Sequence, residues 1–364
     1  MIIQDVINYL EELAPLNYAE DFDNVGLLVG DKTKPLTGVL VTLDTLEDVV
    51  EEAIENNCNL IVSFHPIIFK GLKSLTGKDY VERTVLKAIK NNIAIYAIHT
   101  ALDNALLGVN HMISEKLGLT NKQILIPQKS TIKKLTTFVP NAEISKVRNA
   151  LFAAGAGSIG NYSNCSFNIE GYGTFMGNDN ANPTIGNKNE THTEAETQIT
   201  VIFEKHKQNQ ILKALFNSHS YEEVAYDIVT LDNKNQEIGI GMIGELKKEM
   251  SESNFLDFVK TNMKTECIRH SAFLGKPIKK VAVLGGSGSF AINAAKAQKA
   301  DAYITADLKY HDFFSANNQI LLADIGHFES EQFTKNLLTA YLTKKITNFA
   351  VVLSKTNTNP VNYF

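Results

Sequence analysis

The chain has 364 residues, of which 44% are hydrophobic and 21% are charged, and its formal net charge is −5. This composition is typical of a soluble globular protein, and the length favours two domains over one. The negative charge and the lack of a block of Lys and Arg exclude an obvious nucleic-acid-binding surface, so nucleic acid is an unlikely partner.

Three scattered cysteines, Cys58, Cys165 and Cys267, fit a reducing compartment and exclude both a disulfide framework and a Cys-based zinc knuckle. No apolar run approaches the roughly 20 residues that a membrane-spanning helix needs. Residues 1–15 combine apolar positions at helical spacing with acidic residues, which predicts an amphipathic helix and not a signal peptide. We therefore expect a cytoplasmic protein without a membrane partner.

The first part of the chain alternates apolar strands with amphipathic helices. Each predicted strand ends in an acidic residue or a histidine: residues 38–44 end in Asp44, residues 59–66 in His65–Pro66, and residues 93–99 in His99. This alternation predicts an α/β domain with a mainly parallel sheet that is covered on both faces.

A different pattern begins after Pro127. Strands and helices follow in the order β-α-β-β-α-β, which is typical of a ferredoxin-like α+β domain. An Asn- and Gly-rich stretch between the two middle strands predicts a long polar loop. From Gly239 the first pattern returns, with a helix that Ser251 is predicted to cap and with further strands to residue 354. We therefore predict a discontinuous domain, 1–128 and 239–364, that carries an inserted domain, 129–238.

A candidate metal site is formed by residues that follow predicted strands. His327 and Glu331 are four residues apart after the strand 320–326, so a helix there places both side chains on one face. Loops at the carboxyl ends of parallel strands gather functional groups, and His65, His99 and Asp103 follow other strands. Imidazoles with carboxylates suit Zn, Fe, Mn or Ni, and a carboxylate such as Asp103 can bridge two ions.

Five segments in this order, DNVGLLVGD, SFHPIIFKGLK, AIHTALDNA, TADLKYHD and DIGHFESE, resemble the motifs of the Nif-three-like family, the GTP cyclohydrolase I type 2 homologues. Residues 155–167 and 181–186 resemble the inserted domain of the longer bacterial members, which is similar to the PII/CutA-like fold. The resemblance covers essentially the whole chain. It implies a dinuclear metal site at the bottom of a cleft and a toroidal homohexamer. Counting the departure at Phe64 described below, we expect one or two divalent ions per chain (Zn, Fe or Mn).

The resemblance also implies the metal ligands, which are His65, Asp103, His327 and Glu331 here. The first His of the family's His-His pair corresponds to Phe64, which cannot bind a metal ion. The second ion is then absent or weakly held, or another residue replaces the ligand. His99 is the candidate replacement, and its alternative role is to orient Asp103.

Two other segments have less specific patterns. Lys309 and His311 are candidates for holding a phosphate or for general acid catalysis, and the alternative is a surface turn with a structural histidine. The glycine-rich segment 285–289 resembles a phosphate-binding loop, but it lacks the Lys of a P-loop, and a tight strand-to-helix turn is favoured.

Two classes of function are compatible with these residues. The first is a metal-dependent hydrolase of a small nucleotide-like or phosphorylated substrate, with a metal-activated water as the nucleophile and His99 or His311 transferring protons. The family name alone suggests GTP as a substrate. The second is a non-catalytic metal-binding regulatory or scaffold hexamer, in which the inserted domain senses a ligand or docks a partner.

Overall fold

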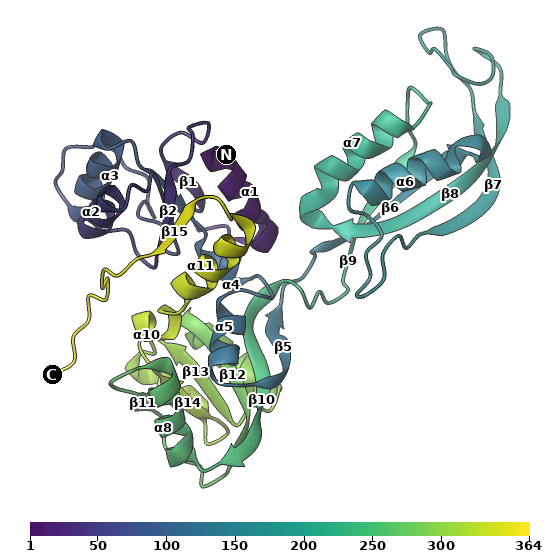
Figure 1. Ribbon diagram of the computed structural model, residues 1–364. Helices are drawn as coiled ribbons and strands as arrows, with labels where there is room; N and C mark the ends of the chain where they lie inside the picture. The colour runs from purple at the N-terminus through teal and green to yellow at the C-terminus, as the bar shows by residue number, and fades with distance from the viewer. The chain divides into compact units, whose positions relative to one another are not determined.

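The computed structural model describes residues 1–364, which form two compact units (Figure 1). The larger unit comprises Met1–Pro127 and Gln236–Phe364, and the smaller unit comprises Gln128–Asn235. The chain thus leaves the larger unit once and returns once, within a few residues of the predicted limits of 129 and 238. No helix of the structure has the length and the apolar character needed to cross a membrane.

The larger unit contains two sheets. The first has five strands in the order β1-β4-β3-β2-β15, and all neighbours are parallel except β1 and β4. Its strands are β1 (Gly26–Val29), β2 (Gly38–Thr42), β3 (Leu60–Ser63), β4 (Ala94–Ala97) and β15 (Ala350–Leu353). The helices linked with it are α1 (Ile3–Leu13), α2 (Glu47–Glu55), α3 (Tyr80–Lys90), α4 (His99–Asp103), α5 (Val109–Lys116) and α11 (Thr334–Lys345), with the 3-10 turn η1 (Leu16–Tyr18).

The second sheet has six strands in the order β11-β14-β13-β12-β10-β5, of which only β12, β13 and β14 are mutually parallel. Its strands are β5 (Thr120–Pro127), β10 (Gly239–Met250), β11 (Arg269–His270), β12 (Ile278–Ser287), β13 (Ala302–Ala306) and β14 (Leu321–Asp324). Its helices are α8 (Glu252–Met263), α9 (Ile292–Ala297) and α10 (His327–Glu331), with the 3-10 turns η4 (Ser289–Ala291) and η5 (Tyr310–Ala316). The predicted α/β class is confirmed, but the mainly parallel arrangement holds for the first sheet alone.

The two sheets share one hydrophobic core. Fully buried side chains from both, such as Val41 and Val62 of the first and Val281 and Ile304 of the second, belong to a single cluster that α1, α5, α8 and α11 complete. Strands with apolar side chains on both faces need cover on both sides, and separate clusters under α2 with α3 and under α9 provide it. The shared core fixes the carboxyl ends of the strands of one sheet relative to those of the other.

The smaller unit has one antiparallel sheet in the order β7-β8-β6-β9 and two helices. Its elements follow as β6 (Ile132–Pro140), the 3-10 turn η2 (Asn141–Glu143), α6 (Ile144–Ala153), β7 (Phe167–Phe175), β8 (His192–Glu204), the 3-10 turn η3 (Lys205–Lys207), α7 (Gln208–Ser218) and β9 (Tyr226–Leu231). Its core consists of its own side chains, with α6 and α7 packed on one face of the sheet.

Local capping explains several helix starts in the larger unit. The Ser251 side chain accepts a hydrogen bond from the N–H of Asn254, as the sequence predicts. Glu82, in the first turn of α3, is a stronger anchor, because its Oε2 atom accepts hydrogen bonds from the N–H groups of Thr76 (2.8 Å), Gly77 (2.9 Å) and Lys78 (3.2 Å). These bonds, that from Thr76 first, lower the pKa of Glu82 to about 2.

Glu82→Gln is therefore expected to destabilise the protein at neutral pH, because an uncharged amide oxygen accepts these bonds less strongly than a carboxylate oxygen. A folded-state pKa below the unfolded value stabilises the protein above the unfolded pKa, and this contribution is lost as the pH falls through about 2. The stability difference between the wild type and Glu82→Gln, measured by urea unfolding, should shrink between neutral pH and that value. Asp48→Asn, at an exposed position of α2, is the control, and a difference independent of pH would contradict the account.

Candidate metal centre

Two strand ends, one from each sheet, place the histidines. His65 follows β3, and His327 begins α10 directly after β14 and Gly326. Gly326 has φ +91°, a conformation that favours glycine, and a Cβ atom there would collide with the side chain of Glu329. The chain therefore turns within two residues of β14, and α10 then carries His327 and Glu331 on one face.

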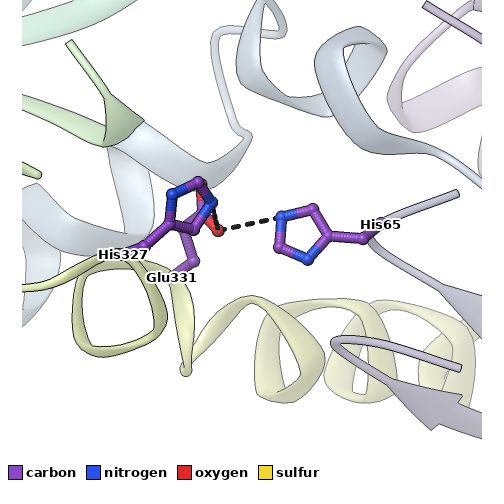
Figure 2. A group of neighbouring side chains, drawn as sticks. All are labelled: His65, His327 and Glu331. Carbon is purple, nitrogen blue, oxygen red and sulfur yellow. Dashed lines mark ion pairs between the residues drawn. The ribbon is translucent and has the colours of Figure 1, made fainter. Parts of the chain in front are cut away.

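The ligand atoms of His65, His327 and Glu331 all lie within 4.8 Å of one another (Figure 2). Glu331 Oε2 is 3.1 Å from His65 Nε2 and 3.3 Å from His327 Nε2. The predicted convergence of His327 and Glu331 from the i, i+4 spacing is therefore present, and His65 reaches the same point from the other sheet.

Both imidazoles are held from behind by a carboxylate. His65 Nδ1 is 2.8 Å from Asp44 Oδ1, and His327 Nδ1 is 2.7 Å from Asp307 Oδ2. A metal-binding histidine commonly donates its second N–H group to a carboxylate, which fixes the ring and makes the other nitrogen a better ligand. Each Nε2 atom is thus directed at Glu331.

Each charge of the cluster shifts the pKa of its neighbours. Burial works against a charge on His65, but Asp44 and Glu331 outweigh it and raise its pKa to about 10. Burial likewise opposes a charge on His327, whose pKa Glu331 and Asp307 raise to about 9. Burial would raise the pKa of Glu331, yet His327 and His65 lower it to about 2. Each of the three groups therefore stabilises the charged form of the others.

The arrangement fits a divalent cation. Glu331 is 3% exposed, and its buried Oε2 atom has no partner beyond the ion-pair contacts to the two imidazoles. The Oδ1 atom of Asp103 is also buried without a donor. Buried carboxylate oxygens need a partner, and two nitrogens with carboxylate oxygens are the donor set of Zn, Fe and Mn sites.

Asp103 lies beside this group but outside the set of three. It is the last residue of α4, and burial followed by the charge of Glu331 raises its pKa well above the usual value. His65 and His327 act on it in the opposite direction, which places all four predicted ligands in one electrostatic neighbourhood. A cation bound between them would offset the repulsion by Glu331 and so favour the ionised form of Asp103.

His99 contacts the cluster through its ring. Its centroid is 5.2 Å from that of His65, and its Nδ1 atom is 2.9 Å from Asp23 Oδ1. The hydrogen-bond partner of His99 is thus Asp23. The predicted alternative role of His99, to orient Asp103, is not seen in its hydrogen bonds. His99 has φ +22°, so the backbone departs from the ordinary helical range where α4 begins.

Three other residues singled out in the sequence lie outside the group of three converging side chains. Phe64 is completely buried in the shared core, and its ring is tilted by 51° against the His65 ring at a centroid distance of 4.9 Å, so it fills space where the resemblance implies a histidine. His311 is exposed on η5 and contacts the rings of Tyr310 and Phe314. The Lys309 N–H group donates to Asp312 Oδ2 at 2.8 Å. This bond belongs to an exposed turn, which is the alternative that the sequence offered for Lys309.

The glycine-rich segment makes room for Glu331. Gly286 has φ +70°, and a Cβ atom on it would collide with Glu331 Oε1. The N–H groups of Gly285 and Gly286 donate to Asn110 Oδ1 (3.0 Å) and Ser330 Oγ (2.9 Å). These donors are therefore engaged within the protein, and the segment is the end of β12 followed directly by η4, which is the strand-to-helix connection favoured over a phosphate-binding loop.

A cavity of about 440 Å³ adjoins the two histidines. Its lining includes His65, His327 and Arg269, together with residues of the C-terminal segment, Asn359 to Val361 and Tyr363. Thr358 donates to Asp44 Oδ2 at 2.6 Å, and Asn359 donates to Glu329 Oε1 at 3.1 Å. The C-terminal segment thus forms a wall of the cavity and also fixes the carboxylate behind His65. No motif in the sequence indicated this role.

The fold and the site define a class: a two-sheet α/β protein with an inserted α+β unit and a His-His-Glu cluster at the carboxyl ends of its strands. The chain belongs to the Duf34/NIF3 (NGG1p interacting factor 3) family, whose profile matches residues 1–360. The family assignment from the five motifs is confirmed.

Relatives and solved structures agree over the whole length. The chain is 39% identical to a protein of Bacillus subtilis (strain 168) named GTP cyclohydrolase 1 type 2 homolog, over 99% of this chain and 98% of that one. It is 35% identical to the Staphylococcus epidermidis protein of the same name, over 100% of both. The crystal structure of a Bacillus cereus protein related to NIF3 covers 100% of this chain and 99% of its own, with 36% identity and a TM-score of 0.86. Staphylococcus aureus protein SA1388 covers the same shares at 30% identity and a TM-score of 0.80.

Gly286→Ala is expected to lower metal content, because its Cβ atom displaces the Glu331 carboxylate. Gly118→Ala is the matched control, since Gly118 has a similar φ of +61° but open space around its Cβ position. Both variants should lose roughly 1–2 kcal/mol from backbone strain. Only Gly286→Ala should show a reduced metal-to-protein ratio by elemental analysis, and equal ratios in the two variants would contradict the role of Gly286.

Asp44→Asn and Asp307→Asn are each expected to weaken Zn²⁺ binding by about 10–100-fold. Each substitution removes the carboxylate that fixes the orientation of one imidazole, His65 or His327. Competition with a chromophoric chelator measures this affinity, and Asp48→Asn is the exposed control. An affinity equal to that of the wild type in both variants would show that the two carboxylates do not support the site.

Proposed function

We propose that His65, His327, Glu331 and Asp103 hold one or two divalent metal ions, and that the protein is a metal-dependent hydrolase of a small nucleotide-like or phosphorylated molecule. The observation that carries the proposal is the convergence of two carboxylate-backed imidazoles on Glu331 Oε2. Catalytic metal sites differ from structural zinc sites in having few protein ligands and an open side. The adjoining cavity supplies that open side.

The bound metal would supply Lewis acidity and lower the pKa of water. The chain's own residues have separate tasks. Asp44 and Asp307 keep the imidazoles aligned, and Glu331 contributes the buried negative charge that holds a cation. Asp103, whose Oδ1 atom lacks a donor, is the ligand through which a second ion would be held. His99, fixed by Asp23 at the ring edge of His65, is the candidate to carry a proton.

The cavity size supports a small substrate. A volume of about 440 Å³ lies in the range of pockets that enclose drug-sized molecules. The side chain of Arg269 lines it, half of it is exposed, and it is paired with Asp324. Arg269 is the cation in the lining suited to a phosphate or another anionic group of the substrate.

A second candidate function is a non-catalytic metal-binding assembly in which the smaller unit senses a ligand. A cavity of about 860 Å³ within that unit favours this function. Under either function we propose the toroidal homohexamer and the PII/CutA-like character of the smaller unit as the resemblance implies them. Light scattering on the purified protein tests the assembly, because a hexamer has six times the chain mass of 40.2 kDa.

Metal content and turnover test the proposed function together. Wild-type protein should bind metal stoichiometrically and hydrolyse GTP or a member of a phosphoester panel. The double variant Asp103→Ala, His327→Ala should lose at least about 100-fold of this rate, since it removes two ligands. Asp48→Asn should keep it.

Glu331→Gln tests metal binding by itself. It keeps the shape of the side chain but removes the buried negative charge, so the metal-to-protein ratio should fall. A ratio equal to that of the wild type would remove Glu331 from the ligand set. If the wild type has full metal content but hydrolyses the substrates only at the background rate of the double variant, the hydrolase proposal is wrong. The non-catalytic metal-binding function then remains.

A further inference from the structure

A second and larger cavity, of about 860 Å³, lies entirely within the smaller unit. Leu135, Ile199 and Val201 of its sheet pack against α6 and α7. Because side chains alternate along a strand, Phe138 and Glu196 lie on the opposite face, which the helices leave open (Figure 1). The cavity forms on this face, under the segment 176–185 and Tyr221.

Two glycines create the hollow. Gly171 and Gly173 of β7 lie on the open face, and Gly171 pairs directly with Glu196 of β8. A Cβ atom on Gly171 would meet nothing within 4 Å, whereas one on Gly173 would collide with Glu196 Oε2. Because these two residues have no side chains, the sheet has a recess there, and the Glu196 carboxylate lies over Gly173 at its edge.

Glu196 has an unused acceptor in this recess. Its residue is 8% exposed, and Oε1 accepts a hydrogen bond from the Tyr221 hydroxyl at 2.8 Å. The Oε2 atom receives no hydrogen bond from the protein. This oxygen is not fully shielded, so a ligand in the cavity can donate a hydrogen bond to it, and a charged donor forms the stronger bond.

The lining has one sign of charge and many aromatic rings. It contains four glutamates and no Lys, Arg or His, and its aromatic residues are Phe138, Tyr172, Phe175 and Tyr221. One glutamate, Glu222, already accepts from the Asn182 N–H group at 2.7 Å. Aromatic faces and carboxylates together attract cations and repel anions, which disfavours a nucleotide or phosphate here. The lining contains no group of three His, Cys, Asp or Glu side chains whose ligand atoms converge as at His65, His327 and Glu331, so a metal ion is also disfavoured.

We propose that this cavity binds a small organic cation, a protonated amine on an apolar body. The ammonium group donates to Glu196 Oε2 in the recess formed by Gly171 and Gly173. The apolar body contacts Phe138 and Phe175 on the open face of the sheet. This site goes beyond the proposed hydrolase and does not depend on it, because none of its residues belongs to the metal centre.

A series of three probes on the wild-type full-length protein tests the charge requirement. Phenethylamine, which is protonated at neutral pH, should bind to saturation in isothermal titration calorimetry. The neutral 2-phenylethanol and the anionic 3-phenylpropionate should bind at least about tenfold more weakly, since a hydrogen bond to a charged group accounts for that factor. Equal affinity for the amine and the alcohol, or no binding of the amine at millimolar concentration, would overturn the proposal.

Two variants test the position. Glu196→Gln should weaken phenethylamine binding at least about tenfold, because it removes the charge and keeps the shape. Gly171→Leu should abolish binding by filling the recess while leaving Glu196 in place. Asp227→Asn, an exposed carboxylate on β9 outside the lining, should bind phenethylamine as the wild type does.

Binding that is unchanged in both Glu196→Gln and Gly171→Leu would place the amine elsewhere and overturn the proposal. The melting temperature of each variant shows whether it is folded. Metal content should equal that of the wild type in all three variants, so a failure of this site is distinguishable from a failure of the metal centre.

Discussion

The approach of two imidazoles to one buried carboxylate is the interaction on which the larger unit is organised. Glu331 and His327 come from the end of the second sheet, and His65 comes from the end of the first. A buried carboxylate without compensating charge is costly, so Glu331 requires either two protonated imidazoles or a cation. The same requirement that makes the site suitable for a metal ion therefore also connects the two sheets.

The supporting residues show why a strand-end site needs more than its ligands. Asp44 and Asp307 each follow a strand and each hold one imidazole from behind, and the C-terminal segment in turn holds Asp44 through Thr358. On the opposite side, Gly286 gives Glu331 the space it occupies. The ligand geometry thus depends on residues from four separate parts of the chain, and each can be tested without removing a ligand.

Local patterns predicted the parts of the fold that depend on local physics. The strand and helix alternation, the Ser251 cap and the His327–Glu331 spacing follow from periodicity and hydrogen bonding within a few residues. Long-range choices were not predictable in this way. The antiparallel neighbours in the second sheet depend on which strands pair across the chain, and the partner of His99 is a residue 76 positions away. Phe64 shows the same limit, because only packing shows that it fills the core beside the His65 ring.

The smaller unit differs from the metal centre in chemistry as well as in fold. Its core contains only its own side chains, so its open sheet face is free to vary without disturbing the ligands of the larger unit. The metal centre combines imidazoles with carboxylates, whereas the cavity of the smaller unit combines carboxylates with aromatic rings and has no basic side chain. Two sites with such different donor sets do not select the same molecule. The amine proposed for the smaller unit would therefore not compete for the cavity beside His65 and His327.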